Sequence, residues 1–405
     1  MKEREPKLSN HMKKQFNFFY QFSLIFLILI SSLACSSNDD PDPTPIEKQE
    51  DILSVDAKVE KFLLDHEIPG ASLAISKNGK LVYQKAFGLQ DVQSGKAMTP
   101  QTQMRVASVS KSFTGLAIML LVQEGRINLD DKVFGDMGIL GNSYGSKPYS
   151  ARVSQVTVKH LLQMTSGGWV INGNRDAIDY QQTLTNESYF DWMLDNATLN
   201  FEPGSQYWYI NSNYFVAARI VEKVSGKSYS QFVKESITDP LKMGSTVLAK
   251  NGLSGKQANE ATYYGQGDTK GFEYNFNIER RDGDAGIVTT AVDLMKIVVA
   301  MDGNASKPDL LRSDFYNQFI QGSNPNQNFA NGIAKSNQFK YFYGALPGTR
   351  SGYMFHSNGM AVTLIFNGNA DYTKTNYSNF ANAHDALMVE LLTKDINVYQ
   401  DIDQF

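Results

Sequence analysis

Two β-hairpins, one toward each end of the chain, set the strongest limit on the fold. The first is the alternating segment GASLAISKNGKLVYQKAFG, which turns at Asn78-Gly79, and the second is GYMFHSNGMAVTLIFNG, which turns at Asn358-Gly359. Asn-Gly favours a tight turn because both central positions need a positive φ, which these residues tolerate. Strands at both ends of the chain predict one antiparallel sheet that joins them.

The sequence between the hairpins is mainly helical. Apolar residues recur at helical spacing before the first hairpin, between the hairpins and after the second, in residues 51–66, 108–124, 158–164, 213–224, 291–301 and 377–392. This order predicts an α/β (α+β) fold, with an antiparallel sheet flanked by helices and an inserted helical subdomain. We expect a cleft between the sheet and the subdomain.

The composition indicates a folded protein that does not bind nucleic acid. Of 405 residues, 42% are hydrophobic, which is enough for one large or two smaller domains. The net charge is -4, and the lysines and arginines form no basic stripe. The histidines lack metal-ligand spacing, so we expect neither a metal nor a cofactor. We expect one of them, His384 in the terminal helix, to face solvent.

The N-terminal segment has the features of a secretory signal. Lys13 and Lys14 precede an apolar run, residues 22–30, that is too short to span a bilayer and ends in SSLAC. This ending resembles a bacterial lipobox, and its cysteine, Cys35, is the only one in the chain. We therefore expect lipid attachment at Cys35. Met1 and Met12 both remain possible starts.

These features divide the chain into three parts. We predict a lipoprotein signal peptide over residues 1–34, an acidic, Pro-rich tether over 35–51 and a single folded domain over 52–397. The predicted location is the bacterial cell envelope, with the lipid on Cys35 as the anchor. We expect a monomer, with a small molecule or a peptide as its partner.

The segment RVASVSKSFTG, residues 105–115, contains a candidate nucleophile and base. Ser108 and Lys111 are three residues apart and share a helix face, whereas Ser110 lies off that face. A buried lysine can lose its proton and then accept the proton of a serine. The helix start beside Ser108 also favours negative charge there. Because S-x-x-K is common by chance, the interpretation requires further partners.

Tyr209 and Asn211 are such partners, in the YIN sequence between a Pro-Gly turn and an apolar helix. We expect a tyrosine beside a lysine to have a lowered pKa and to shuttle protons. ASVSKSFTG and YIN resemble the S-x-x-K and Y-x-N motifs of the serine beta-lactamase and penicillin-binding-protein superfamily. The likeness is to its class C beta-lactamase, DD-peptidase and esterase branch. It covers nearly all of the chain after the tether, including INLDDKV, VTVKHLLQMTSGG, DPLKMGST and DAGIVTTAVDL.

The third motif of that branch, His-x-Gly or Lys-Thr-Gly, is altered in this chain. The matching segment is KYFYGALPGTRSGY, which places Phe342 at the basic position, followed by Tyr343 and Gly344 as further substrate-binding candidates. The resemblance implies an oxyanion hole formed by the backbone amides of Ser108 and Ala345. If so, Phe342 changes only the choice of substrate.

A missing base could instead weaken activity toward beta-lactams or D-Ala peptides. Lys340, Tyr343 and Arg350 are the nearby candidates to replace it. Because a strand alternates faces, Lys340 shares a face with Phe342 but not its position.

The sequence leaves three functions open. The first is an envelope-anchored serine hydrolase that forms an acyl-enzyme on Ser108, as an esterase, a D-amino-acid peptidase or a weak penicillin-interactive enzyme. The second is a catalytically weakened or silent lipoprotein of the same fold that binds cell-wall or other ligands, which Phe342 favours. The third is an α/β-hydrolase with Ser143 in the G-x-S-x-G sequence GNSYG, although Pro148 opposes the helix that such an elbow needs.

Overall fold

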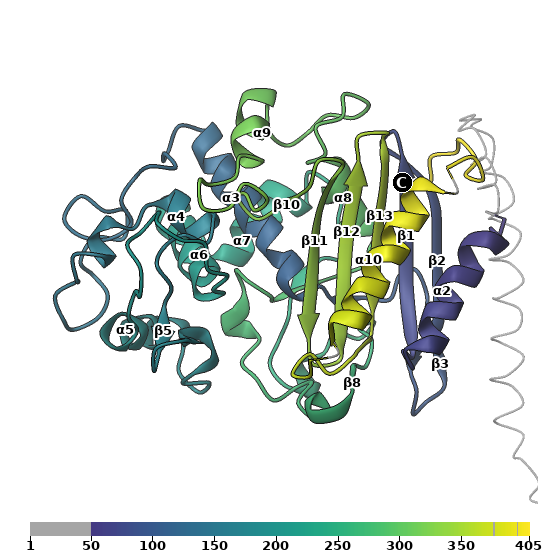
Figure 1. Cartoon of the computed structure of the whole chain (residues 1–405), viewed down its shortest axis with the longest axis horizontal. Helices are drawn as coiled ribbons and strands as arrows, with labels where there is room; N and C mark the ends of the chain where they lie inside the picture. The colour runs from purple at the N-terminus through teal and green to yellow at the C-terminus, as the bar shows by residue number, and fades with distance from the viewer. Residues whose placement is uncertain (1–49, 376, 395) are drawn as a thin grey trace, which may run out of the picture. The chain divides into compact units, whose positions relative to one another are not determined.

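The structure is a computed structural model that describes residues 50–405 except 376 and 395. Cys35, the predicted signal peptide and all but the last two residues of the predicted tether lie outside the described residues. Residues Asp51–Phe405 form one compact unit (Figure 1). Within the described part of the chain, no helix combines the length and the apolar character needed to cross a bilayer.

A seven-stranded antiparallel sheet joins the two ends of this unit. Its order is β10-β11-β12-β13-β1-β2-β3. The strands are β1 (Gly70–Lys77), β2 (Lys80–Asp91), β3 (Lys96–Ala97), β10 (Ala334–Lys335), β11 (Phe339–Leu346), β12 (Thr349–His356) and β13 (Met360–Phe366). β1 from the first hairpin pairs along its length with β13 from the second. The predicted sheet is thereby confirmed.

Both predicted hairpins form, but their turns differ. Asn78 and Gly79 have φ values of 50° and 76°, as a two-residue turn of this hand requires. The second connection spans residues 357–359, and only Gly359 has a positive φ, 86°. The extra residue removes the need for a positive φ at Asn358.

Helices form close to each of the predicted ranges, and the structure adds helices that were not predicted at residues 186–196, 229–233 and 313–319. The helices are α2 (Leu53–Asp65), α3 (Ser110–Gln123), α4 (Val158–Leu162), α5 (Asn186–Asn196), α6 (Ser212–Ser225), α7 (Tyr229–Val233), α8 (Ala291–Val299), α9 (Ser313–Phe319) and α10 (Tyr377–Thr393). Short 3-10 turns are η1 (Ala107–Val109), η2 (Val153–Gln155), η3 (Ala177–Asp179), η5 (Leu253–Gly255), η6 (Gly267–Thr269) and η7 (Glu279–Arg281), and η4 (Lys234–Thr238) is a π-helix. Minor strands are β4 (Met104–Arg105), β5 (Val170–Ile171), β6 (Arg175–Asp176), β7 (Val247–Leu248), β8 (Tyr264–Gly265), β9 (Ile287–Thr289) and β14 (Gly368–Asn369).

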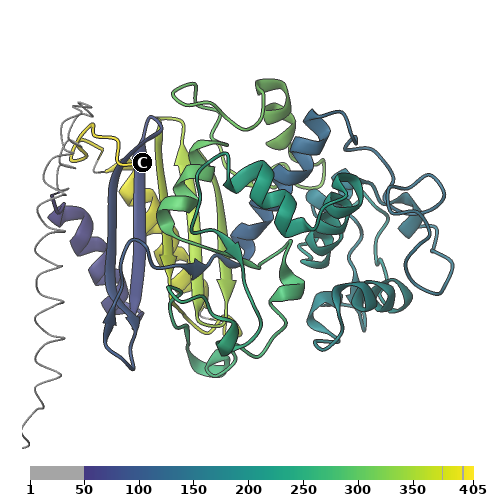
Figure 2. The same cartoon turned by 180° about the vertical axis from the view of Figure 1, so that it is seen from behind.

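Helices cover both faces of the sheet. α2 and α10 lie on one face (Figure 1). Their Phe62 and Leu387 pack in one apolar cluster with side chains of β1 and β13. α8 packs against β1 and β13 from the other face (Figure 2). The expectation that His384 faces solvent is wrong, because it is fully buried on α10, which packs against β12 and β13, and its Nδ1 accepts a hydrogen bond from Arg350 Nε at 2.9 Å.

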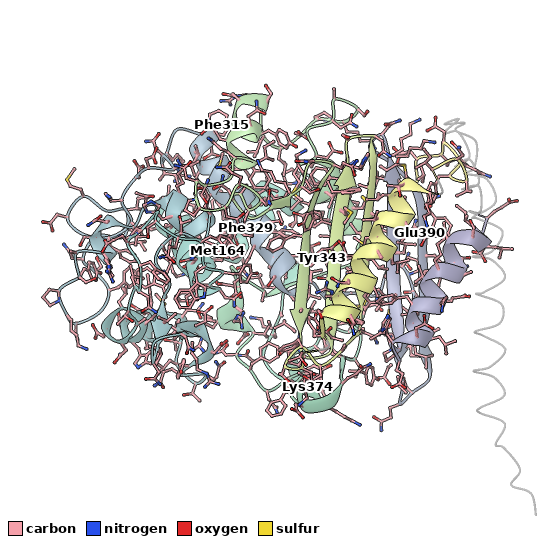
Figure 3. All side chains as sticks on the ribbon, in the orientation of Figure 1. Met164, Phe315, Phe329, Tyr343, Lys374 and Glu390 are labelled. Atoms are coloured by element: carbon pink, nitrogen blue, oxygen red, sulfur yellow. The ribbon has the colours of Figure 1, made fainter. Side chains whose placement is uncertain are left out.

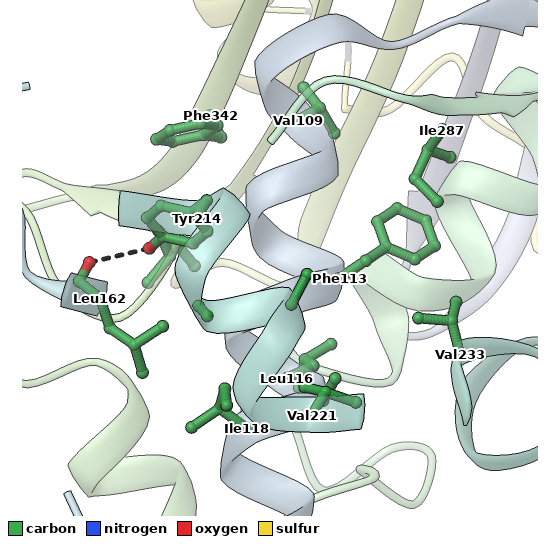
Figure 4. Close-up of a cluster of buried hydrophobic side chains, with 14 of the residues drawn as sticks. Val109, Phe113, Leu116, Ile118, Leu162, Tyr214, Val221, Val233, Ile287 and Phe342 are labelled. Carbon is green, nitrogen blue, oxygen red and sulfur yellow. Dashed lines mark hydrogen bonds between the residues drawn. The ribbon is translucent and has the colours of Figure 1, made fainter. Parts of the chain in front are cut away.

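The helical part is built around α3. Every residue of α3 from Ser110 to Val122 is buried, because α6, α7 and α9 surround it. Its Phe113 and Leu116 pack in the same apolar cluster as Val221 of α6 and Val233 of α7 (Figure 4). α3 is thus the internal helix of the fold, and its N-terminus reaches the sheet through η1, which contacts β11 and β12. This junction is where the motif residues meet.

Candidate active site

Ser108 lies in η1 and not in α3 itself. The single helix predicted over 108–124 is therefore too long at its start, because Ala107 adopts a φ of 47° and α3 begins only at Ser110. This left-handed residue turns the chain sharply before the helix. Ser108 is half-buried, whereas its neighbours Ala107 and Val109 are fully buried. The hydroxyl of Ser108 is thus held at the surface of the junction.

The amine of Lys111 lies beside the hydroxyl of Ser108. Lys111 Nζ donates to Ser108 Oγ at 3.1 Å, to Asn211 Oδ1 at 2.8 Å and to the carbonyl oxygen of Asp284 at 3.0 Å. It also lies 5.0 Å from the centre of the Tyr209 ring. The predicted pairing of Ser108 with Lys111 is present, and Tyr209 and Asn211 join them.

Burial changes the charge of this lysine. The Lys111 side chain is fully buried, and burial lowers its pKa to about 7, although the carboxylate of Asp284 opposes the shift. A large fraction of Lys111 is therefore a neutral amine at neutral pH. A neutral amine 3.1 Å from Ser108 Oγ can accept its proton.

The YIN segment is held in place by the carboxylate of Asp176, at the end of β6. Asp176 accepts hydrogen bonds from the backbone N–H of Asn211 at 2.5 Å and from Ser212 Oγ at 2.5 Å. Asn211 is the N-cap residue of α6, so this carboxylate also stabilises the start of the helix. Asp176 thereby fixes the amide of Asn211 where it meets Lys111.

The pKa of Tyr209 is shifted upward, whereas we expected it to be lowered. Burial raises the pKa of its hydroxyl above the usual value of 10.0, although a side-chain hydrogen bond with Ser108 acts in the other direction. Although the residue as a whole is 37% exposed, its hydroxyl lies among protein groups and hydrogen-bonds with Ser108. Tyr209 is therefore a protonated donor at neutral pH.

The amide of Ala345 lies at the free edge of the sheet. A two-residue turn, Pro347–Gly348, joins β11 to β12, so Leu346 and Thr349 form a hydrogen-bonded pair. Ala345 belongs to the next pair, which is not hydrogen-bonded, and its N–H therefore points away from β12. β10 covers β11 only at Lys340 and Tyr341. The Ala345 amide is free to bind another acceptor.

Gly344 lets η1 approach β11. A Cβ at this position would lie 2.1 Å from the carbonyl oxygen of Val106, 2.5 Å from Ser351 Oγ and 3.0 Å from Ala107 Cβ. Ser351 Oγ also donates to the carbonyl of Val106 at 2.6 Å. The absence of a side chain at Gly344 thus brings the segment that carries Ser108 against the strand that carries Ala345.

Phe342 fills the position of the missing base with an aromatic contact. It is only 5% exposed and packs on Phe329, with ring centres 5.7 Å apart. Phe329 in turn meets the rings of Tyr209 at 6.2 Å and Tyr207 at 5.5 Å. Phe342 therefore forms part of the support behind Tyr209 and exposes little surface to a substrate.

The side chain of Tyr343 is not in the site, contrary to expectation. It lies on the other face of β11, where its hydroxyl bonds to Asp385 of α10 and its ring contacts His384 at 5.2 Å (Figure 3). The physical reason is the two-residue alternation of a strand, which turns Tyr343 away when Phe342 and Gly344 face Ser108.

Neither cation near Phe342 replaces the missing base. The guanidinium of Arg350 lies on the face of the sheet covered by α10, 5.0 Å from the centre of the Tyr343 ring. The amine of Lys340 lies over the ring of Phe355, 5.5 Å from its centre. These contacts direct both cations away from Ser108.

The other candidate serines have structural roles or none. Ser110 Oγ accepts from the backbone N–H of Ile287 at 3.0 Å, and Ser112 Oγ donates to the carbonyl of Gly332 at 2.7 Å. Ser143 is exposed in a turn, with no strand before it and no helix after it. The α/β-hydrolase alternative is therefore wrong for this chain.

Two charged residues behind Lys111 were missed by sequence reasoning. Asp284 is fully buried, and its carboxylate lies 3.8 Å from Lys111 Nζ and accepts two hydrogen bonds of 2.9 Å from Arg281 Nε. The available signal was the sequence RRDGDAG, in which charges precede a buried strand. Among the described residues, no group of three or more His, Cys, Asp or Glu side chains is arranged to hold a metal.

These features define the class of beta-lactamase-like serine hydrolases. They are a serine in the turn just before a buried helix, a lysine three residues later, a tyrosine from the helical part and a free strand edge. The chain belongs to the beta-lactamase family, which residues 55–387 match. The family prediction is thereby confirmed at this level.

Curated relatives have similar sequences. Protein flp of Staphylococcus aureus (strain MW2) is 29% identical over 346 residues, which cover 84% of this chain and 66% of flp. Penicillin-binding protein 4* of Bacillus subtilis (strain 168) is 29% identical over 262 residues, which cover 62% of this chain and 52% of that protein. The chain thus spans less than two thirds of the length of these relatives.

Solved structures share the fold. D-amino acid amidase from Ochrobactrum anthropi SV3, complexed with D-phenylalanine, has a TM-score of 0.65 at 21% identity, over 84% of this chain and 99% of that chain. The octameric penicillin-binding protein homologue from Pyrococcus abyssi has a TM-score of 0.64 at 23% identity, over 84% and 78%. These likenesses confirm the predicted fold class.

Proposed function

We propose that this protein is a serine hydrolase that cleaves an ester or amide bond through an acyl-enzyme on Ser108. The observation that carries the proposal is the buried amine of Lys111, 3.1 Å from Ser108 Oγ and with a pKa lowered to about 7. A base poised near neutral pH is what activation of a serine requires. Ser108 itself is half-buried and accessible to a substrate.

The acylation step follows from the protonation states. Ser108 Oγ attacks the carbonyl carbon while its proton passes to the neutral amine of Lys111. Tyr209, which stays protonated, gives its proton to the leaving oxygen or nitrogen and regains one from the Lys111 ammonium. In deacylation, water attacks the acyl carbon, its proton passes through the same two groups, and Ser108 leaves with a proton. Asn211 holds the amine throughout.

Backbone amides stabilise the negative charge in this proposal. Ser108 and Ala345 belong to the two segments that Gly344 brings together, and in this proposal the N–H groups of both donate to the oxygen of the tetrahedral intermediate. The start of α3 at Ser110 adds its positive dipole end. The side chain at position 342 has no part in this stabilisation.

The substrate is a neutral ester or amide in this proposal. The buried ring of Phe342 stands where the resemblance expects a carboxylate-binding base, and Lys340 and Arg350 point elsewhere. A carboxylate beside the scissile bond would therefore be desolvated without a partner. Beta-lactams and D-Ala peptides, which carry such a carboxylate, are expected to be poor substrates.

A catalytically silent, ligand-binding protein is the second candidate. Phe342 in place of a base favours it, because the third motif is the position at which this chain departs from the family's pattern. The candidate predicts a folded protein whose Ser108 does not react.

The test is hydrolysis of a panel of neutral p-nitrophenyl esters and D-amino acid amides beside the beta-lactam nitrocefin. We expect ester hydrolysis, little nitrocefin turnover, and a loss of at least about 10³-fold in kcat/KM for Ser108→Ala. Ser143→Ala is the matched control and should retain full activity. No activity above Ser108→Ala with any substrate would support the silent protein.

We further propose that the hydrolase is a class C-like member of the family that is anchored in the cell envelope. The SSLAC sequence, the single Cys35 and the Pro-rich tether support this. Metabolic labelling with an alkyne-bearing palmitate should tag the wild-type protein in membranes. The tag should be absent from Cys35→Ser, and labelling of that variant would contradict the anchor.

A further inference from the structure

A buried ion pair lies beside Lys111. Arg281 at the end of η7 and Asp284 three residues later form a two-point contact, with Arg281 Nε 2.9 Å from each carboxylate oxygen and Arg281 Nη2 2.6 Å from Oδ2. The same Asp284 Oδ2 lies 3.8 Å from Lys111 Nζ. Three charged groups therefore share one buried site.

We propose that Arg281 and Asp284 act as a positioning pair, which holds the Lys111 amine against Ser108 and sets whether that amine is charged. For its catalytic consequence this inference rests on the proposed function. Both residues act through Lys111 and neither contacts the nucleophile in the described structure.

The positioning part follows from the hydrogen bonds. The carbonyl of Asp284 accepts from Lys111 Nζ at 3.0 Å, so the backbone of residue 284 is one of the three partners that orient the amine. The two-point contact with Arg281 fixes the Asp284 side chain. Arg281 is itself held by Asp179, with Nη1 3.7 Å from Oδ1.

The charge part follows from the groups that face Lys111. The carboxylates of Asp284 and Asp176 favour the ammonium form, and the guanidinium of Arg281 and the loss of water disfavour it. The uncharged neighbours are Ser108, Asn211 and the rings of Tyr209 and Tyr214, which lie 5.0 and 5.8 Å from Nζ.

Removing one member of the pair should therefore shift the pKa of Lys111, and the charge that remains sets the direction of the shift. In Arg281→Gln the Asp284 carboxylate is unopposed and favours the ammonium, so the pH at which Lys111 becomes neutral rises. In Asp284→Asn the guanidinium remains and disfavours the ammonium, so that pH falls. A charge as close as Asp284 Oδ2, 3.8 Å from Lys111 Nζ, shifts the pKa of an amine by about one unit or more.

The experiment is the pH dependence of acylation of Ser108 by a fluorophosphonate, measured between pH 5 and 10. We expect the midpoint of the wild-type curve near pH 7, a rise of about one unit in Arg281→Gln and a fall of about one unit in Asp284→Asn. Arg281→Lys, which keeps the charge, should move the midpoint less than Arg281→Gln. The double variant, which leaves no unpaired buried charge, should return toward the wild-type midpoint.

Asp282→Asn is the matched control for damage to the loop. Asp282, two residues before Asp284, is also buried and pairs with Arg219, and neither member of that pair is among the strongest influences on the pKa of Lys111. Its midpoint should stay at the wild-type value even if stability falls. Equal midpoints in all variants, or shifts of the same sign in Arg281→Gln and Asp284→Asn, would overturn the inference.

A second readout separates this inference from the proposed function. The ¹³Cε signal of Lys111 in lysine-labelled protein, assigned through its loss in Lys111→Met, reports the charge of the amine without any reaction. Opposite shifts of this titration in the two single variants would uphold the charge control even if Ser108 proved unreactive. If both single variants kept the wild-type titration of Lys111 while Ser108 reacted normally, the proposed function would stand. The inference that Arg281 and Asp284 set the charge of Lys111 would then be overturned.

Discussion

Lys111 is the side chain on which the proposed chemistry depends most, and it should also cost the protein stability. Its pKa in the folded protein is about 7, below the model-peptide value of 10.5. Between these two pH values the unfolded chain binds a proton that the folded protein does not. The contribution of Lys111 therefore becomes more favourable as the pH rises from about 7 to 10 and is constant below that window.

Lys111→Met should reveal this linkage. We expect the free energy of unfolding of the wild type, relative to Lys111→Met, to rise with pH above 7 by up to about 1.4 kcal/mol per pH unit. Urea unfolding of both proteins at several pH values measures the difference. A difference that does not change between pH 7 and 10 would mean that Lys111 is charged in the folded protein.

Tyr209 should matter most when the leaving group needs a proton. Tyr209→Phe removes the proposed donor, so hydrolysis of an amide should fall by about 10²-fold or more. Hydrolysis of a p-nitrophenyl ester should fall much less, because p-nitrophenolate leaves without a proton. Comparison of kcat/KM for one acyl group on both leaving groups tests this, and equal losses would assign Tyr209 another role.

The part of the site that is local in sequence could be predicted, and the part that depends on distant segments could not. Ser108 and Lys111 are three residues apart, and helical spacing alone pairs them. The lowered pKa expected for Tyr209 was wrong, because its sign depends on burial by distant segments. Asp284 reaches Lys111 across 173 positions of the chain, and no local pattern encodes that contact.

The junction of η1 with β11 is the contact between elements that builds the site. The sequence predicts one continuous helix over 108–124 and so does not predict this junction. Sequence periodicity cannot show that Ala107 takes a left-handed φ. The resemblance to a known family did identify Gly344, since its motif ends in glycine. The structure supplies the reason, which is the backbone of Val106 lying against that position.

Gly344→Ala should separate η1 from β11. The added Cβ would lie 2.1 Å from the carbonyl oxygen of Val106, so one segment must move. We expect a loss of about 1–3 kcal/mol in the free energy of unfolding and at least a tenfold slower reaction of Ser108, since proposed oxyanion donors shift.

Gly244→Ala is the control for this substitution, because a Cβ there meets no atom within 4 Å and the position has no positive φ. It should keep the wild-type stability and rate. Full activity in Gly344→Ala would contradict the proposed oxyanion hole.

The C-terminal residues close the sheet at the edge opposite β11. The backbone N–H of Gln404 donates to the carbonyl of Leu81 at 2.9 Å, and Asp403 accepts from the N–H of Leu81 at 3.2 Å. Lys80 pairs with Asp401 at 3.0 Å. These contacts cover part of β2 that β3 leaves open, since β3 pairs only near Leu89 and Asp91.

Removal of residues 401–405 should therefore lower stability without changing the chemistry. We expect a loss of about 1–3 kcal/mol and faster aggregation on heating, because an unpaired strand edge is exposed. The rate of Ser108 acylation at 25 °C should stay at the wild-type value. Thermal unfolding with light scattering measures stability and aggregation, and fluorophosphonate kinetics measure the acylation rate. A slower acylation would contradict the prediction, because it would mean that the contacts of residues 401–405 with β2 affect the site beside β11.

The architecture as a whole was predictable because the hairpins carry strong local signals and lie at the two ends of the chain. Alternation in the first hairpin and the turns at Asn78-Gly79 and Asn358-Gly359 indicate antiparallel strands without long-range information. The buried state of His384 was not predictable, because it depends on α10 lying across β12 and β13. Such packing is decided by the assembled fold.

The central claim, that Ser108 is an activated nucleophile, is tested most directly by locating a covalent adduct. The purified protein is treated with a fluorophosphonate at pH 8, digested and mapped by mass spectrometry. We predict a single adduct on the peptide that contains Ser108, absent from Ser108→Ala and formed at least about 10²-fold more slowly in Lys111→Met. No adduct on the folded wild-type protein, or an adduct on any other serine, would contradict the claim.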